Sequence, residues 1–531
     1  MKKNSFFEGA FIATIGIVIV KVIGLIYVIP FNAIIGEQGG ALYGYGYNIY
    51  QLFLAISSAG FPFAISKMTS EYLALNDKGA IIKTYNIAKK LILYLSIIIF
   101  IGLFVFATPI AKMIIGSSTG GNSYSDIAFV IRMVSFAILI VPFLSVTKGF
   151  LQGYKFITPI SVSQVIEQIV RVVVILVGSY LALNVFSLKL RDAAGISVFA
   201  AFIGGLFAYI YLKIKINKSK LLKERLDTKV KDKEVFNKLI KYSVPFIIIS
   251  VVYNLYSITD MILVSRTMND ILKIDGNITE SVLSVFTTWG TKLNNILLAI
   301  TTGITTSLIP NIVSSYTAGD SKDVDSKFNK TIKSILLIIV PMTLFLSMLA
   351  DNVWMLFYGN STYGPLVYKL FVFYALFGGT YSIIVNMLQG INKYKLVISG
   401  VLFGLVFNLI FDVPFILLFD KLGLNPSWGA IICGCIGYSA SIFMSIFVLA
   451  KKYKFNFNET WEKILSYFVS WIIFVSTIFV LKQVIPENIN GRLIQIPIIG
   501  VYAIISFGIY VLIHYFNGNI KELFDLKRGK K

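Results

Sequence analysis

Histidine, cysteine and acidic residues are scarce in this sequence. The 531 residues include one His, two Cys and 26 Asp or Glu, and only 14% are charged. Cys433 and Cys435 lie two apart in an apolar segment without His or acidic neighbours, so neither a disulfide nor a metal site is expected. The single His514 is expected at the membrane interface, near the end of the last apolar segment. No G-x-x-x-x-G-K-[ST] loop is present, which excludes nucleotide hydrolysis by the P-loop route.

Apolar residues dominate the chain instead. They make up 56% of it and the mean hydropathy is +0.79, which is typical of membrane proteins. The 48 Lys and Arg residues fall in short segments between long apolar ones, so we expect no nucleic-acid partner and no soluble domain of useful size. The first apolar segment, about residues 9–35, is too long for the core of a signal peptide and is expected to be a transmembrane helix.

The predicted fold class is an all-α polytopic membrane protein with fourteen transmembrane helices. The first twelve form two parallel six-helix lobes, and the last two have no counterpart. The helices are expected near residues 22, 58, 99, 137, 169, 204, 255, 300, 341, 377, 408, 440, 474 and 504. The predicted parts are an N-lobe (residues 1–215), a basic linker (216–240), a C-lobe (241–452), and two final helices with a basic tail (453–531).

A sequence repeat supports the two lobes. The segment Leu54–Ser58 (LAISS) recurs 244 residues later as Leu298–Thr302 (LAITT), and Leu151–Gly153 (LQG) recurs 237 residues later as Leu388–Gly390. Two like halves of a membrane chain are typical of transporters, with the pathway between them. Because each copy has an even number of helices, both copies are expected to enter the membrane from the same side.

The distribution of basic residues predicts the orientation. With a cytoplasmic N-terminus, most of the 48 basic residues fall in cytoplasmic segments, above all in the linker between the two copies. The outer loops then contain only six basic residues: Lys112, Lys189, Arg191, Lys273, Lys421 and Arg492. This positive-inside bias predicts a multi-pass membrane protein with both termini in the cytoplasm.

Ionisable residues inside the predicted spans indicate interior surfaces, because a charge in lipid costs at least a few kcal/mol. Lys21 lies in the middle of the first helix. It is interpreted either as a cation that lines a cavity or as the partner of a nearby carboxylate. Glu167 and Arg171 in the fifth helix are four residues apart, so they can neutralise each other. Gln164 extends their face, which could bind sugar hydroxyls or form a switch.

Two further residues complete the candidate cavity. Asp260 in the seventh helix is too short to reach the interface, and Lys292 lies in the outer half of the eighth helix. Lys21, Arg171 and Lys292 outnumber Glu167 and Asp260 among these charges. This balance favours an anionic headgroup such as a phosphate or pyrophosphate over a cationic drug.

Glycine and proline recur beside hydroxyl-rich runs in the second and eighth helices, at corresponding places of the two copies. This pattern is typical of helices that bend beside a transport pathway. Tight packing through small residues is the alternative. Gly24 and Pro30 likewise allow the first helix to bend. The candidate bending residues are therefore Gly24, Pro30, Gly60, Pro62, Gly303 and Pro310.

Four segments resemble one known family. They are Gly24–Asn32 (GLIYVIPFN), Gly39–Tyr45 (GGALYGY), Ala64–Lys67 (AISK) and Ser163–Arg171 (SQVIEQIVR). On these motifs, and over essentially its whole length, the chain resembles the Gram-positive branch of the MurJ-type lipid II flippases. That family belongs to the MOP superfamily of polysaccharide-biosynthesis and MATE-like transporters, and it has two helices beyond the twelve that the superfamily shares.

The resemblance implies a transporter, not an enzyme. The implied activity moves undecaprenyl-pyrophosphate-linked disaccharide-pentapeptide from the inner to the outer leaflet of the bacterial plasma membrane by alternating access. It implies a lipid-linked glycan and membrane lipids as partners, a monomer, and no cofactor beyond coupling to membrane potential or a monovalent ion. Lys21 falls where the family has a basic residue in the first helix, and Lys292 falls near the family's basic residue of the eighth helix. Tyr27 and Leu54 stand where Gram-negative members have arginines.

Three other functions stay open at this point. The chain could be a flippase for another undecaprenyl-linked polysaccharide or for a sporulation wall precursor. It could be a cation-coupled drug antiporter, which predicts an acidic pocket. A membrane enzyme of glycan assembly would need carboxylates gathered at one interface, and the sequence shows no such group.

Overall fold

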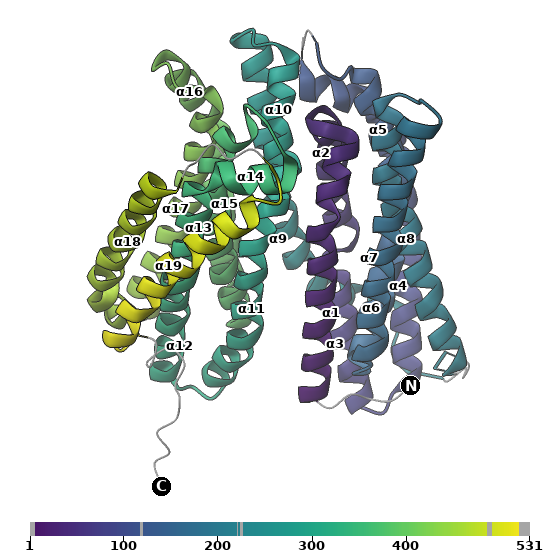
Figure 1. Ribbon diagram of the computed structural model, residues 1–531. Helices are drawn as coiled ribbons and strands as arrows, with labels where there is room; N and C mark the ends of the chain where they lie inside the picture. The colour runs from purple at the N-terminus through teal and green to yellow at the C-terminus, as the bar shows by residue number, and fades with distance from the viewer. Residues whose placement is uncertain (1–5, 117–119, 220, 223–226, 486–490, 520–531) are drawn as a thin grey trace. The chain divides into compact units, whose positions relative to one another are not determined.

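The computed structural model describes residues 6–116, 120–219, 221–222, 227–485 and 491–519, except for the side chains of residues 6, 7, 10 and 306–310. Every regular element in these ranges is a helix, which confirms the all-α prediction (Figure 1). The chain divides into two compact units, unit 1 with residues 1–289 and unit 2 with residues 290–531.

Unit 1 contains ten α-helices among its described residues. They are α1 (Phe6–Ile26), α2 (Val28–Ser58), α3 (Phe61–Ala74), α4 (Lys78–Ile115), α5 (Tyr124–Ile138), α6 (Val141–Gly153), α7 (Ile157–Tyr180), α8 (Leu190–Lys218), α9 (Asp232–Arg266) and α10 (Gly276–Thr287), with π-helical turns η1 (Leu181–Val185) and η2 (Thr267–Ile271). Thus α9 and α10 pack in unit 1, although the sequence repeat assigns them to the second copy. The compact units are defined by contacts between residues, whereas the lobes are defined by the sequence repeat. The lobe boundaries therefore stay a prediction.

Unit 2 begins one residue after the start of α11. Its elements are α11 (Trp289–Thr317), α12 (Ser321–Ser334), η3 (Ile335–Ile339), α13 (Val340–Met348), α14 (Ala350–Tyr358), α15 (Gly364–Gly390), α16 (Tyr394–Lys421), α17 (Pro426–Tyr453), α18 (Asn458–Val484) and α19 (Gln495–Phe516). Within this unit α16 packs against α17, and α18 packs against α19.

Many of these helices are suited to a membrane. Among the described residues, twelve are long and apolar enough to cross one, and Phe11–Ile26 is a shorter apolar helix. The helix α2 consists of two segments that meet at Gly36, where φ is +64° and ψ is −163°. It therefore contains both the end of the first predicted span and the start of the second. The protein is a multi-pass membrane protein, while the number fourteen stays a prediction.

The repeat is visible in local hydrogen bonds. The Ser57 hydroxyl donates to the Leu54 carbonyl at 3.2 Å, and its counterpart Thr301 donates to the Leu298 carbonyl at 2.8 Å. Both Leu-Gln-Gly motifs end a helix and are followed two residues later by a left-handed residue, Lys155 (φ +64°) or Asn392 (φ +59°). The next N–H then donates to the Leu carbonyl of the motif, at 3.0 Å in one copy and 2.8 Å in the other.

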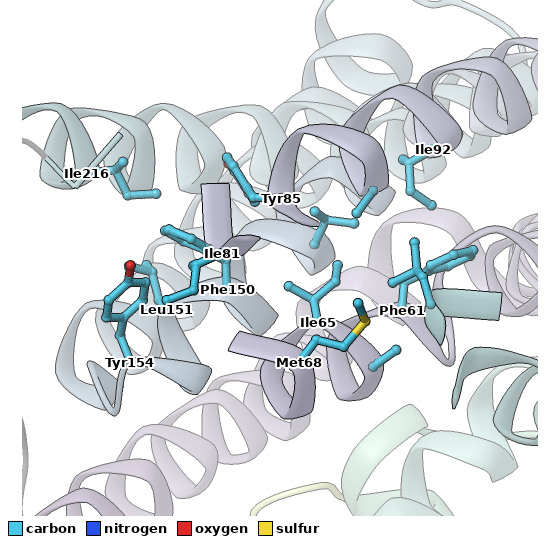
Figure 2. Close-up of a cluster of buried hydrophobic side chains, with 14 of the residues drawn as sticks. Phe61, Ile65, Met68, Ile81, Tyr85, Ile92, Phe150, Leu151, Tyr154 and Ile216 are labelled. Atoms are coloured by element: carbon cyan, nitrogen blue, oxygen red, sulfur yellow. The ribbon is translucent and has the colours of Figure 1, made fainter. Parts of the chain in front are cut away.

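A buried apolar cluster joins α3, α4, α6 and α8 in unit 1 (Figure 2). Met68 from α3 is fully buried in it, and the rings of Tyr85 and Phe150 lie 4.5 Å apart between centroids. The Tyr85 hydroxyl also forms a 3.1 Å hydrogen bond with the Thr147 hydroxyl, so its polar atom is satisfied inside the core. This packing anchors α6, which carries Lys148 at the site described below.

The last two helices are held to the rest of unit 2 by hydrogen bonds to freed carbonyls. Pro341 lacks an N–H, so it cannot bond the Leu337 carbonyl in the preceding turn, where η3 interrupts the α-helix. The Tyr510 hydroxyl donates to that carbonyl at 3.1 Å, and Trp471 Nε1 donates to the Leu336 carbonyl at 3.2 Å. Side chains from α18 and α19 thus satisfy the backbone groups that a proline leaves open.

The side chain of His514 packs inside the protein near the end of α19, and its expected position at the membrane interface stays a prediction. Its side chain is completely buried, with its ring 4.4 Å from the Tyr510 ring and 5.4 Å from the Tyr467 ring between centroids. Asn519 Nδ2 lies 2.9 Å from His514 Nδ1. The aromatic neighbours come from both α18 and α19, and the sequence pattern of one helix does not reveal such a contact.

Candidate functional site

A pocket of about 220 Å³ lies among α1, α6 and α7, wholly within unit 1. Its polar lining residues come from all three helices, and two apolar residues of α1 complete it. The lining residues are Ile17, Val20, Lys21, Lys148, Gln164, Glu167, Gln168 and Arg171. Three of the four ionisable groups are cationic, so the pocket has a formal charge of +2.

Glu167 is the single anion of this pocket and it contacts two cations. Its Oε1 accepts a hydrogen bond from Arg171 Nη2 at 2.9 Å, and its Oε2 accepts one from Lys148 Nζ at 2.9 Å. The three side chains are only 16–19% exposed. Strong charge-assisted bonds therefore hold the carboxylate between the two cations.

Small residues let the helices around the pocket approach closely. A Cβ at Gly204 of α8 would lie 2.7 Å from the Glu167 carbonyl oxygen, and one at Gly16 of α1 would lie 2.9 Å from Ser161 Cβ on α7. A Cβ at Gly24 would lie 3.4 Å from Gln168 Nε2. Glycine at these positions sets the backbone of α7 close to both neighbours.

Arg171 has capacity for a further partner. Its Nε is buried and has no hydrogen-bond partner among the described residues, while Nη2 bonds Glu167. Tyr43, Tyr47 and Tyr50 of α2 lie within electrostatic range of its charge. A guanidinium with an open donor beside two ammonium groups is suited to a phosphate-type oxyanion, which accepts from several donors at once.

The structure brings four of the predicted site residues together in this pocket. Lys21, Gln164, Glu167 and Arg171 all line the pocket. Asp260 is in α9, is 3% exposed and does not line it. Lys292 lies in α11 of unit 2, and its role stays a prediction.

Lys148 is the pocket residue that the sequence analysis missed. It lies near the end of α6, three residues before the first Leu-Gln-Gly motif, and it binds Glu167 nineteen positions away. An ionisable residue close to the edge of an apolar span was the available signal. That signal does not say which of the other helices the side chain faces.

The predicted bending residues lie at or near two helix interruptions. The regular α-helix is interrupted at Tyr27, between Gly24 in α1 and Pro30 in α2, and again at Ala59–Gly60, just before Pro62 in α3, although the backbone dihedrals at these residues stay right-handed. Each proline lacks the N–H that would bond the carbonyl four residues earlier, which opens the helix at that turn. A Cβ at Gly60 would lie 2.2 Å from the Ser243 carbonyl oxygen of α9, so this position also permits a close helix contact.

The glycine and proline at the corresponding places of the second copy, Gly303 and Pro310, lie in α11. Outside the adjacent turns of its own helix, no described atom lies within 4 Å of the place where a Cβ of Gly303 would be. Pro310 is in the same helix, and its side chain lies outside the described residues. Within the described residues, no three His, Cys, Asp or Glu side chains gather in a way that could hold a metal ion.

Sequence comparison gives one family. The family model described as polysaccharide biosynthesis protein matches residues 6–315. The chain is 32% identical over 463 residues to the lipid II flippase MurJ of Bacillus subtilis (strain 168), covering 85% of this chain and 83% of that protein. It is 24% identical over 390 residues to the stage V sporulation protein B of the same organism, which covers 71% of each chain.

Solved structures of low sequence identity share the fold. A lipid II flippase MurJ in an inward closed conformation matches with a TM-score of 0.68 at 16% identity, over 96% of this chain and 99% of that chain. An inward-facing multidrug resistance MATE family transporter of the MOP superfamily matches with a TM-score of 0.61 at 14% identity, over 82% and 97%. These matches confirm the MOP-type fold. On the sequence matches, the chain belongs to the polysaccharide biosynthesis protein family, and within it to the MurJ group.

Proposed function

We propose that this chain is a lipid II flippase, which moves undecaprenyl-pyrophosphate-linked disaccharide-pentapeptide from the inner to the outer leaflet of the bacterial plasma membrane. The observation that carries the proposal is the 32% identity, over 85% of the chain, to a protein with that activity in its name. The formal charge of +2 in the pocket of unit 1 supports an anionic headgroup.

In this proposal the pyrophosphate binds Lys21, Lys148 and Arg171, and the polyprenyl tail stays in lipid. Glu167 holds Lys148 and Arg171 in place while the pocket is empty, because it bonds both at 2.9 Å. The arriving pyrophosphate competes with Glu167 for the same donors, which limits how tightly it is held and allows its release. The amide of Gln164 adds neutral hydrogen bonds.

The remaining parts of the mechanism are also proposals. The chain acts as a monomer with both termini in the cytoplasm and cycles by alternating access without a cofactor. One charge that crosses 100 mV is worth about 2.3 kcal/mol, so a cationic pocket can couple the return step to membrane potential. Lys292 and Asp260 are assigned to the same pathway, and separate variants test them.

The experiment is depletion of the chain in its host, followed by measurement of how much lipid-linked precursor is exposed on the outer leaflet. Lys148→Ala and Arg171→Ala should each fail to restore exposure, because one lost charged hydrogen bond lowers affinity about 10- to 100-fold. Lys90→Ala changes an exposed lysine of α4 and should restore exposure fully. Full restoration by both pocket variants, at normal protein levels, would rule out the pocket as the headgroup site.

A second candidate function is transport of a sporulation wall precursor. It is supported by the 24% identity to the stage V sporulation protein B over 71% of the chain. Depletion separates the two functions, since loss of a lipid II flippase arrests wall synthesis in growing cells. Loss of a sporulation transporter leaves growth intact and blocks spore formation.

A further inference from the structure

Glu280 of α10 is a buried carboxyl group away from the pocket. Only 4% of the residue is exposed. Its helix α10 is not among the described helices that are long and apolar enough to cross a membrane. Glu280 also contacts Asn122, in the segment between α4 and α5, which the topology proposed above places on the outer side. Glu280 is therefore at the outer face in that topology.

Asn122 holds this carboxylate through both its backbone and its side chain. Its backbone N–H donates to Glu280 Oε1 at 2.6 Å, and its Nδ2 donates to Glu280 Oε2 at 2.9 Å. The same Nδ2 also donates to the Gln38 carbonyl oxygen at 3.0 Å. All three N–H donors of Asn122 are thus used. They connect α10 with the segment before α5 and with α2.

The segment around Asn122 fits closely against the carboxylate. Gly121 has a φ of +70°, and a Cβ there would lie 2.7 Å from Glu280 Cδ. Gln38 Nε2 in turn donates to Asn277 Oδ1 at 2.6 Å, a second link between α2 and α10. We call residues 120–123 the Asn122 loop. Two of the hydrogen bonds that attach it to α10 require both oxygens of one carboxylate to act as acceptors.

We propose that Glu280 is a proton-binding site, and that protonation of its carboxylate releases the Asn122 loop from α10. A neutral carboxyl group presents an O–H on one oxygen, which opposes one of the two Asn122 donors instead of accepting from it. The Tyr45 hydroxyl is buried without a hydrogen-bond partner among the described residues, and Tyr45 lies within electrostatic range of Glu280. In this proposal the Tyr45 hydroxyl accepts the new O–H.

The surrounding groups favour proton uptake near neutral pH. Burial raises the pKa of the Glu280 carboxyl to about 7, against the hydrogen bonds from Asn122, which lower it. Asp126 of α5 and Asp275 at the start of α10 raise the pKa further. Asp126 lies 3.5 Å from Arg191 of α8, which partly offsets its charge. The negative charges of Asp126 and Asp275 thus both disfavour ionisation of Glu280.

Hydrogen–deuterium exchange of the full-length protein in lipid nanodiscs tests the proposal. Rates of peptides covering the Asn122 loop are measured from pH 5.5 to 8.5 and divided by the intrinsic rate at each pH. Protection should fall about tenfold as the pH drops through about 7, since a charged hydrogen bond is lost. Glu280→Gln, which mimics the neutral acid, should show low protection at every pH. Glu37→Gln, on neighbouring α2, should keep the wild-type response.

Infrared difference spectroscopy detects protonation of the carboxyl group directly. A purely structural role of Glu280 would not produce a carboxyl band that titrates near pH 7. A protonated carboxyl band that titrates near pH 7 should be present in the wild type and absent in Glu280→Gln. Asn122→Ala removes a donor that lowers the pKa, so the midpoint of the band should move upward. A band that titrates below pH 5.5, a flat protection profile, or a wild-type response in Glu280→Gln would each overturn the proposal.

Discussion

Arg171 and Glu167 face each other across one turn of α7, with Nη2 2.9 Å from Oε1, while the other carboxylate oxygen binds Lys148. This arrangement makes the pocket self-neutralising in part. Removing only the carboxylate therefore raises the positive charge of the pocket and leaves its cations in place. The same change tests whether Glu167 competes with an anionic ligand.

Glu167→Gln should bind inorganic pyrophosphate about tenfold more tightly than the wild type, because the ligand no longer displaces an internal anion. Transport should become slower at the same time, since tighter ground-state binding raises the barrier to release. Titration calorimetry on the purified protein measures the first effect, with Glu37→Gln as the control for charge. Weaker or unchanged pyrophosphate binding would contradict the competition.

Gly204→Ala should destabilise unit 1 by about 1–3 kcal/mol. The added Cβ would lie 2.7 Å from the Glu167 carbonyl oxygen and 3.3 Å from Arg171 Cβ, so α8 must move away from α7. Gly102→Ala in α4 is the matched control, because nothing lies within 4 Å of its Cβ position. Gly102→Ala should raise the free energy of unfolding by up to about 1 kcal/mol, because alanine is a better helix former than glycine. Thermal unfolding in one detergent compares the two, and equal stability of both variants would disprove the close contact.

The local features of this molecule could be predicted from the sequence. Helices follow from the apolar runs, and the contact of Glu167 with Arg171 follows from their spacing of four on one helix. The hydroxyl bonds of Ser57 and Thr301 match because the same short motif forms the same turn of helix twice. In each case the interacting groups lie within one turn of each other.

Contacts between helices could not be predicted in the same way. Lys148 meets Glu167 because α6 and α7 pack together, and Asn122 meets Glu280 across 158 positions. The burial of His514 could not be predicted for the same reason, since its neighbours come from another helix as well as its own. A single sequence carries the periodicity of each helix, but not the angle at which two helices meet.

Tyr510→Phe should lower the stability of unit 2 by about 1 kcal/mol, because the Leu337 carbonyl loses its donor. In a Pro341→Ala background the new N–H of residue 341 can bond that carbonyl, so the same tyrosine change should cost less. A double-mutant cycle from chemical unfolding measures the difference. Tyr94→Phe, at an exposed position of α4, is the control and should cost nothing. Equal costs of Tyr510→Phe in both backgrounds would show that the hydroxyl does not replace the missing donor.

The pH dependence of stability should contain a contribution from Glu280. The pKa of its carboxyl in the folded protein is about 7, above its ordinary value of 4.5, so the folded state binds more protons than the unfolded state between these values. This contribution is therefore fully present below about pH 4.5 and is lost as the pH rises through about 7. Over that window it amounts to about 3 kcal/mol, at about 1.4 kcal/mol for each pKa unit.

Glu280→Gln has no carboxyl proton to release between pH 4.5 and 7. The free energy of unfolding of the wild type, relative to that of the variant, should therefore fall over this range and stay constant above pH 7. Chemical unfolding at half-unit steps of pH measures this difference. Glu37→Gln should keep the wild-type profile, because it leaves the Asn122 loop intact. A difference between wild type and Glu280→Gln that grows with rising pH would show that the carboxylate is stabilised by Asn122 more than it is penalised by burial.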